Sequence, residues 1–325
     1  MVQPRSMLAA APPAFLEASP HAPSRVAQEL QGGLLAQPAH IDPKYLYDTL
    51  GSSLFTAITQ LPEYYPTRCE AEILHDYAAD IARHTGPVDS LIDLGAGDCA
   101  KAERLFNSLR PRRYVPIDIS VDYLQTAVQR LQHAYPGLPI IALGQDFHHA
   151  LELPDTLPAS GRLFFYPGSS IGNLNPDQAL ALLTRIRSAC AGGGLLIGVD
   201  RVKPRGVLEP AYDDALHLTA AFNLNLLRHV NHLLGSDFDV RHWTHVAHYD
   251  EPHSRIQMYL QALSAVQVTW LGGQRRFGSG ERIHTENSYK YTIDGFRELL
   301  ARAGYTDVQH WSDARDWFSV FSARA

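Results

Sequence analysis

Two glycines and a lysine follow a short apolar run in the segment Ser90-Leu-Ile-Asp-Leu-Gly-Ala-Gly-Asp-Cys-Ala-Lys101. This order is typical of a strand, a tight glycine loop and a helix N-terminus, the unit with which α/β enzymes hold nucleotide-like cofactors. A dinucleotide-binding loop would carry a third glycine where this chain has Ala100. The pattern therefore favours S-adenosylmethionine (SAM), which has no pyrophosphate to bind. An ordinary strand-to-helix turn also needs glycine, so the loop alone leaves both interpretations open.

Acidic residues recur at the carboxyl ends of the strands that the sequence predicts. Asp118 lies 21 positions after Gly97, where a carboxylate can accept hydrogen bonds from both ribose hydroxyls. Asp146 beside Phe147 suits an adenine, because the carboxylate accepts from the exocyclic amine and the ring packs on the base. Each acid taken singly is as well explained as a helix cap or a solvated loop residue. Their recurrence at successive strand ends indicates a cofactor site.

Alternating strand and helix patterns must position these residues. Strand patterns separated by helical spacing predict a parallel sheet with its site beyond the carboxyl ends. The predicted strands are 90–94, 114–118, 140–143, 162–166 and 194–200, and the predicted helices are 99–108, 120–133 and 176–190. The fold class that follows is α/β, a Rossmann-like class I SAM methyltransferase.

The alternation stops after Asp200. Helical spacing predicts a long helix from Tyr212 to Gly235 and another from Ser288 to Gly304, and alternating segments between them predict antiparallel strands. Two strand patterns near the C-terminus predict an antiparallel pair that completes the sheet. We expect a second α+β substrate domain, with these boundaries: a disordered tail at 1–26, a helical part of the substrate domain at 27–85, the SAM-binding domain at 86–200, an insertion at 201–286, and a return to the methyltransferase domain at 287–325.

Several segments between Tyr45 and the C-terminus together carry a resemblance to one family. They are Leu61-Pro-Glu-Tyr-Tyr-Pro-Thr-Arg68, the Gly95 loop with Lys101, Gly168-Ser-Ser-Ile-Gly-Asn-Leu174, Ala211-Tyr-Asp-Asp-Ala215, Ala220-Ala-Phe-Asn223, Arg255-Ile-Gln-Met258 and Thr285-Glu-Asn-Ser-Tyr-Lys-Tyr291. The chain resembles the SAM-dependent L-histidine Nα-methyltransferases of ergothioneine biosynthesis. The resemblance implies transfer of three methyl groups from SAM to the α-amino group of L-histidine, which gives hercynine.

The resemblance also implies a role for each matching residue. The cofactor-binding set is Tyr64, Gly95, Lys101, Asp118, Asp146 and Phe147. The substrate-binding set is Tyr47, Tyr64, Gly168, Asn173, Tyr212, Met258, Glu286 and Ser288. Asp98 and Cys99 depart from the small hydroxyl residues expected after Gly97, which affects the detailed loop contacts and not the choice of cofactor.

Elementary chemistry agrees with the substrate set. Glu286 and Ser288, two apart on an extended segment, face one side and could satisfy both nitrogens of an imidazole. Asn173 and Tyr212 could donate to the α-carboxylate. The plainer alternatives are a solvated strand face, a turn cap and a packed tyrosine. Since the nucleophile must be the neutral amine, we assign Tyr47 the catalytic role of orienting the amine and relaying its proton.

Composition limits the partners. A net charge of −6 with no basic run predicts no nucleic acid and no membrane surface as partner, and a small molecule instead. Three scattered cysteines, Cys69, Cys99 and Cys190, fit a reducing compartment, so we expect a cytoplasmic monomer. The spacings His242-x-x-His245-x-x-His248 and His229-x-x-His232 invite a metal. No cysteine or carboxylate completes a ligand set, so no metal is expected.

Two other functions stay open. One is an N-methyltransferase of another aromatic amine, such as tryptophan or an indole alkaloid precursor. Glu286 with Met258 argues against it, because an acid facing an indole is poorly matched. The other is a non-catalytic SAM-binding protein, since a fold alone does not fix a function.

Overall fold

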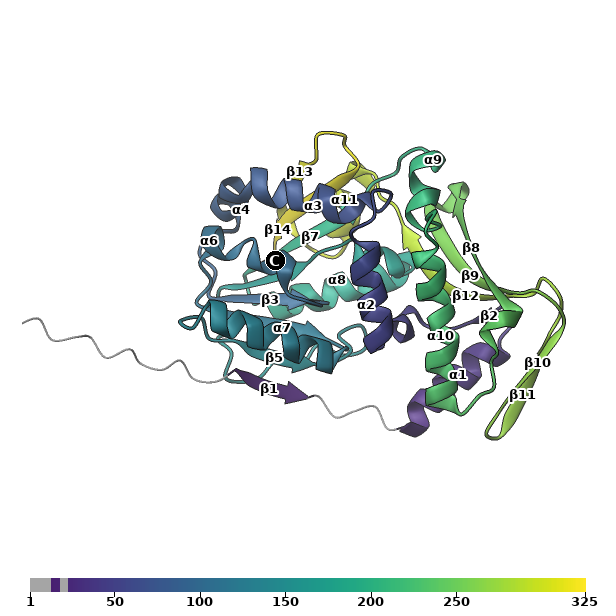
Figure 1. The fold of residues 1–325 in the computed structure, drawn as a ribbon. Coiled ribbons are helices and arrows are strands. Elements are labelled where there is room, and N and C mark those ends of the chain that lie inside the picture. Colours follow the sequence, from purple (N-terminus) through teal and green to yellow (C-terminus); the bar gives the residue numbers. More distant parts are fainter. Residues whose placement is uncertain (1–12, 18–22) are drawn as a thin grey trace, which may run out of the picture.

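A computed structural model describes residues 13–17 and 23–325 of the chain (Figure 1). Its main layer is an eight-stranded sheet in the order β1-β5-β4-β3-β6-β7-β14-β13. The strands are β1 (Ala14–Glu17), β3 (Ser90–Leu94), β4 (Arg113–Asp118), β5 (Ile141–Gly144), β6 (Arg162–Tyr166), β7 (Gly194–Asp200), β13 (Thr306–Ser312) and β14 (Phe318–Arg324). Strands β1 and β3 to β7 pair in parallel, and β14 is antiparallel to both β7 and β13. This confirms the predicted α/β class and its terminal antiparallel pair.

Helices cover both faces of this sheet. All five residues of β3 are buried, as expected for a strand enclosed from both sides, and neighbouring residues such as Leu91 and Ile92 belong to different core clusters. One face packs on α8 (Pro176–Cys190) and α11 (Ile293–Arg302). The other face packs on α3 (Tyr65–Asp76), α4 (Ala78–Thr85), α5 (Ala100–Glu103), α6 (Phe106–Leu109) and α7 (Val121–Ala134).

A smaller sheet lies beside the first layer, drawn mainly in green in Figure 1, in the order β2-β12-β9-β8. Its strands are β2 (Ala39–His40), β8 (Trp243–Asp250), β9 (Arg255–Ala262) and β12 (Arg282–Tyr289). Burial alternates along β9, so one face of the sheet is covered. Helix α10 (Leu218–Leu234) packs on β8 and β9 and also contacts α1 (Pro23–Leu35), α2 (Thr49–Ile58) and the 3-10 helix η1 (Pro43–Leu46).

The remaining elements connect these layers. The strands β10 (Val266–Trp270) and β11 (Gly273–Phe277) form a separate hairpin. The short helices are η2 (Ser170–Asn173), α9 (Arg205–Leu208), η3 (Glu209–Ala211), η4 (Val240–His242) and η5 (Glu251–His253). No helix in the described part of the chain is long and apolar enough to cross a membrane.

The N-terminal region differs from the expected tail. Residues 14–17 form β1, which extends the large sheet in parallel beside β5, and α1 already begins at Pro23. Backbone pairing, such as Ala14 N donating to Ile140 O over 3.2 Å, creates this strand, and four residues carry too little pattern to predict it. The rest of the predicted tail, 1–12 and 18–22, lies outside the described residues.

Two predicted helices begin later than their patterns suggest. Helix α10 starts at Leu218 rather than Tyr212, because the Asp214 carboxylate accepts from the backbone N–H groups of Leu218 and Thr219 at 3.0 and 2.8 Å and so caps the helix. Ser288 belongs to β12, and α11 starts only after Thr292, whose hydroxyl accepts from Gly295 N. The single helix expected at 99–108 is two short helices, α5 and α6.

The packing also moves two expected domain boundaries. Helices α3 and α4 contact β14 of the large sheet, so the second half of the segment 27–85 covers the SAM-binding layer. Strand β12 of the small sheet continues to Tyr289, three residues past the end expected for the insertion. Helical periodicity identifies a buried face but not its partner, which is why the boundaries were misplaced.

Candidate functional site

Two adjoining cavities lie at the carboxyl ends of the parallel strands, where the large sheet meets the small one. The large cavity has a volume of about 800 Å³ and the small cavity about 50 Å³. Both are lined by Tyr47, Phe55, Gly168, Ser170 and Asn173. The two cavities therefore meet at these five residues.

The glycine loop forms one wall of the large cavity. Gly95 and Gly97 have positive φ angles of 70° and 53°, and an added Cβ would meet nothing within 4 Å at either position. Backbone conformation, and not lack of space, requires glycine here. The loop is fixed by Asp118, whose Oδ2 accepts from Gly97 N and whose Oδ1 accepts from Ser120 N, both at 2.8 Å.

Asp118 lines the large cavity with a carboxylate that is almost fully desolvated. Burial raises its pKa above the ordinary value, and the N–H donors of Ser120 and Gly97 partly oppose this rise. Each oxygen has a second lone pair beyond the one that the backbone uses. The carboxylate can therefore still accept from a vicinal diol, so this part of the donor set fits the ribose of the predicted cofactor.

Lys101 connects three segments at the other side of the loop. Its Nζ lies 2.9 Å from Glu70 Oε2 on α3, and Glu70 Oε1 accepts from Gly168 N at 2.8 Å. A Cβ on Gly168 would lie 2.7 Å from Lys101 Nζ. The flexible lysine could move away from such a side chain, but Gly168 has a positive φ of 77°, so the backbone conformation favours glycine where the two cavities meet. Glu70 is a residue that sequence reasoning missed.

Asp146 and Phe147 also line the large cavity. Asp146 Oδ2 lies 2.8 Å from His149 Nδ1 and 3.5 Å from Lys44 Nζ. Although burial raises its pKa, Lys44 and His149 bring that pKa below the ordinary value. The ring of Phe147 packs edge-on against Tyr166. Sequence reasoning did not foresee Lys44, which comes from η1 and gives the acid a cation partner.

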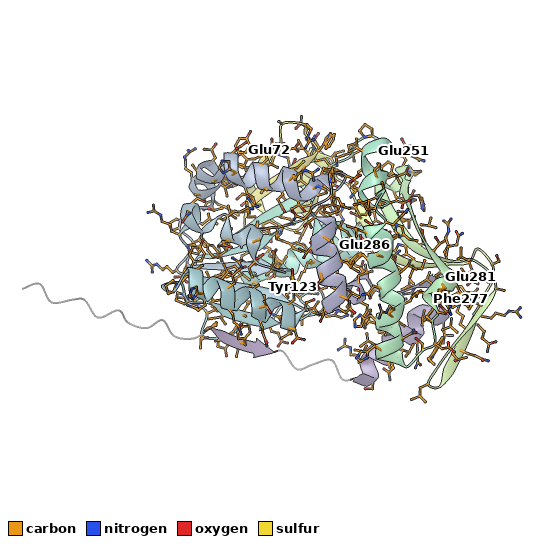
Figure 2. The ribbon with its side chains drawn as sticks, viewed as in Figure 1. Glu72, Tyr123, Glu251, Phe277, Glu281 and Glu286 are labelled. Atoms are coloured by element: carbon orange, nitrogen blue, oxygen red, sulfur yellow. The ribbon has the colours of Figure 1, made fainter. Side chains whose placement is uncertain are left out.

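Side chains of the small sheet and its helices form the small cavity. Glu286 lies in the interior of the molecule (Figure 2) and is 7% exposed. It pairs across the sheet with Met258, and Ser288 pairs with Ile256. Burial raises the pKa of Glu286 to about 7. Residues that line this cavity but not the large one include Ile58, Tyr64, Tyr212, Phe222, Met258, Glu286 and Ser288. The expectation that Glu286 and Ser288 face the same side is confirmed.

Aromatic rings enclose the junction of the two cavities. The ring of Tyr47 lies 5.6 Å from Phe55 and 5.5 Å from Phe222, both edge-on, and Tyr64 lies 6.3 Å from Tyr212. Burial raises the pKa of each of these three tyrosines well above the ordinary value, so all three remain neutral phenols. Tyr64 lines only the small cavity, whereas the sequence assigned it to both ligands. Phe55 and Phe222 were not predicted.

A buried polar cluster lies directly behind Tyr212 and Ser288, whose hydroxyl oxygens are 2.7 Å apart. Lys290 Nζ donates to both oxygens, at 2.8 and 2.7 Å, and lies 2.7 Å from Asp200 Oδ2. Neither Lys290 nor Asp200 was predicted. Asp200 ends β7, so the strand-end argument used for Asp118 could have found it. Lys290 lies in the Thr285–Tyr291 segment that carries the family resemblance, but no role was assigned to it from the sequence.

The histidine-rich spacing does not form a metal site. His245 contacts Asn223 and the carbonyl oxygen of Tyr212, at 2.9 and 2.8 Å, and His248 stacks on Tyr259. Within 13–17 and 23–325, no group of three or more histidine, cysteine or acidic side chains could hold a metal ion. These histidines support packing and hydrogen bonding in the small sheet.

Comparisons with known proteins match the chain over most of its length. A family model described as "Histidine-specific methyltransferase, SAM-dependent" matches residues 26–325. The chain is 38% identical over 301 residues to a histidine N-alpha-methyltransferase of Mycolicibacterium smegmatis, covering 90% of this chain and 92% of that protein. A protein of the same name from Mycobacterium tuberculosis is 39% identical with the same coverage. Ergothioneine biosynthesis protein 1 of Schizosaccharomyces pombe is 27% identical, over 85% of this chain and 38% of that protein.

Proposed function

Because the chain belongs to the SAM-dependent, histidine-specific methyltransferase family, we propose that it transfers three methyl groups from SAM to the α-amino group of L-histidine. The product is Nα,Nα,Nα-trimethylhistidine, or hercynine, for ergothioneine biosynthesis. The observation that carries the proposal is the junction of the two cavities at Tyr47, Gly168 and Asn173. A donor in the large cavity and an acceptor in the small cavity would meet there.

SAM is the methyl donor of this enzyme, and it supplies a methyl group already activated on a sulfonium. The chain itself has to align three atoms and exclude water. In the large cavity, Asp118 would accept from the ribose hydroxyls, and Asp146 with Phe147 would hold the adenine. The Gly95 loop and Lys101 shape the end nearest to the small cavity.

In the small cavity, Glu286 and Ser288 would recognise the imidazole. The carboxylate of Glu286 accepts the ring N–H, and a hydroxyl hydrogen reaches the other nitrogen. Asn173 and Tyr212 would donate to the α-carboxylate, and Met258 borders the ring. This arrangement supports histidine over an indole, because an indole offers one N–H and no acceptor nitrogen.

The reacting amine must lose a proton before it attacks. An α-amino group with a pKa near 7.7–8.0 is mostly protonated at neutral pH, and entry into a desolvated pocket favours its neutral form. Tyr47, a neutral phenol at the junction, would accept the ammonium proton on its hydroxyl oxygen while it releases its own hydroxyl hydrogen to a water molecule, which leaves the amine lone pair free to attack the methyl group. It would not act as a phenolate base.

Repeated methylation leaves a permanent positive charge on the amine. The rings of Tyr47, Phe55 and Phe222 contact one another at the junction, and aromatic faces attract quaternary ammonium groups. Each methylation replaces an N–H of the amine, so a site that held the amine by hydrogen bonds would lose one contact at every step. Aromatic rings attract the cation without such hydrogen bonds and therefore support continuation to the trimethyl product.

The test is product analysis by mass spectrometry after incubation with SAM and either histidine or tryptophan. We expect histidine carrying one, two and finally three methyl groups, and no methylated tryptophan. Calorimetry with histidine in the presence of the demethylated cofactor separates binding from turnover. Preferential methylation of tryptophan would favour the aromatic-amine alternative, and SAM binding without any product would favour the non-catalytic one.

A further inference from the structure

Lys290 is buried behind the acceptor pocket with its ammonium group fully engaged. Its side chain has 0% exposure, and its three contacts are Asp200 Oδ2, Tyr212 Oη and Ser288 Oγ, all at 2.7 to 2.8 Å. An ammonium group has three hydrogens and no lone pair. Each hydrogen therefore has one acceptor, and none is left for a ligand.

This geometry decides where the two hydroxyl hydrogens point. Because Lys290 can only donate, the oxygens of Tyr212 and Ser288 both accept from it, and neither hydroxyl hydrogen is directed toward it. One hydrogen bridges the 2.7 Å contact between the two oxygens. The other remains for an acceptor atom in the small cavity, which both residues line.

We propose that Lys290 is a positioning residue that orders the Tyr212–Ser288 hydroxyl pair, so that the one hydroxyl hydrogen not used between them is held as a donor toward the amino-acid acceptor. The inference rests on the proposed function and deepens it. Without the ammonium group, either hydroxyl could turn its hydrogen toward the vacated space and present only lone pairs to the substrate. The carboxylate and the acceptor nitrogen of histidine both accept hydrogen bonds, so either can take this hydrogen, and Asn173 offers its amide group as a further donor.

The surrounding charges keep the ammonium group in place. Asp200 is fully buried, and although burial raises its pKa, Lys290 and Lys203 bring that pKa below the ordinary value. Tyr65 Oη also donates to Asp200 Oδ2 at 2.7 Å. Asp200 is ion-paired with both lysines, so each buried ammonium group has a counter-charge in direct contact.

Lys203 provides a matched control for this role. It is buried, with 2% side-chain exposure, and is ion-paired with the same Asp200 carboxylate. Its other partners are Tyr65 Oη at 2.9 Å and the carbonyl oxygen of Arg201 at 2.5 Å. Neither Lys203 nor Tyr65 lines the small cavity. Replacing either lysine removes one cation from Asp200, but only Lys290 touches the hydroxyl pair.

The experiment compares Lys290→Met with Lys203→Met in the full chain. We expect Lys290→Met to raise the KM for histidine about 30-fold, while Lys203→Met changes it by less than about threefold. The Kd for SAM, measured by calorimetry, should stay within about twofold of the wild-type value in both variants. Equal rises in KM for the two variants would show a purely structural role and overturn the proposal.

A cycle with the hydroxyl pair tests the mechanism directly. In a Tyr212→Phe, Ser288→Ala background, adding Lys290→Met should raise KM by less than about threefold, because its partners are already absent. A full 30-fold rise in that background would contradict the proposal. If a methionine variant does not fold, Lys290→Gln and Lys203→Gln repeat the comparison with a polar group kept at each position, and Lys290→Gln should again raise KM more than Lys203→Gln.

The wild-type protein separates this inference from the proposed function. If it makes no methylated histidine, the proposed function fails and the inference fails with it. If the wild type is active and the two lysine variants behave alike, the role of Lys290 alone is wrong.

Discussion

The two cavities differ in the source of their polar groups. The large cavity is lined in part by α1, η1, α2, α3, α8 and β12, but its cofactor-type groups come from loops at the ends of β3, β4 and β5, where backbone N–H groups and strand-end acids such as Asp118 lie close together. The small cavity takes side chains from α2, α10, β9 and β12, brought together from positions 55 to 288. The polar groups of the small cavity are buried. Among the described residues no cation contacts Glu286 directly, and Lys290 lowers the pKa of Glu286 only through its charge.

This difference separates two kinds of recognition. A cofactor that the whole fold class shares can be held by backbone geometry and by one acid per strand. A specific amino acid needs buried polar groups that are left unpaired by the wrong ligand. Changes in the small cavity should therefore alter acceptor kinetics with little effect on SAM, and changes in the large cavity should do the reverse.

The largest effect is expected from Glu286→Met. The substitution removes the acceptor for the imidazole N–H in a desolvated pocket, so kcat/KM for histidine should fall about 300-fold. SAM affinity, measured by calorimetry, should stay unchanged. Glu286→Gln keeps an acceptor oxygen and should lose about tenfold. Glu251→Met is the control, because Glu251 lies at the surface (Figure 2). If Glu286→Met lowered SAM affinity as strongly as it lowers kcat/KM for histidine, the proposed division between the two cavities would be wrong.

The next effect is expected from Tyr47→Phe. The ring that packs on Phe55 and Phe222 is kept, and only the hydroxyl at the junction is lost. We expect kcat to fall about 100-fold, with the Kd values for SAM and histidine changed by less than about threefold. Product formation at saturating SAM and histidine measures kcat. Tyr77→Phe is the control, because Tyr77 is exposed. Unchanged turnover would exclude Tyr47 from the proton relay.

Asp118→Asn should weaken SAM binding by about 30-fold. Both carboxylate oxygens accept backbone N–H groups, so an asparagine must point its NH₂ group at one of these donors. Histidine KM at saturating SAM should change little. The exposed Asp122→Asn, at the start of α7, makes the same chemical change outside the loop and should leave SAM affinity intact. A larger effect on histidine than on SAM would contradict the division between cavities.

The smallest effect is on stability, and it depends on pH. Burial raises the pKa of Glu286 from 4.5 to about 7, so between these values the folded chain binds more protons than the unfolded one. The free energy of unfolding therefore falls as pH rises through this window. Glu286→Gln removes the cost of burying this charge. The difference in free energy of unfolding between the variant and wild type should therefore be larger at about pH 8 than at about pH 5, by on the order of 1–2 kcal/mol in favour of the variant.

Denaturant unfolding at the two pH values measures this gain. Glu251→Gln should show no comparable gain, because its carboxylate is exposed in the folded protein. Equal stability differences at both pH values would show that Glu286 is solvated in the folded protein.

The cofactor side could be predicted from the sequence because its signals are local. The glycines, Asp118, Asp146 and Phe147 each follow a strand by a short distance, and parallel strands bring their carboxyl ends to one edge. The acceptor residues were identified by resemblance, and the structure shows that all of them line one small cavity. Long-range pairing explains what was missed: Lys290 reaches Asp200 and Tyr212 across 90 and 78 positions.

The sequence by itself determined the α/β order, the glycine loop and the types of side chain available to each ligand. Hydrophobic periodicity and φ-permissive glycines act within a few residues, so they can be recognised without a fold. Only the tertiary structure decided that Tyr64 lines the small cavity and not the large one, that α3 and α4 cover the large sheet, and that Lys290 contacts two hydroxyls. Such pairings depend on which buried faces meet, and a buried ammonium group must find acceptors wherever the packing provides them.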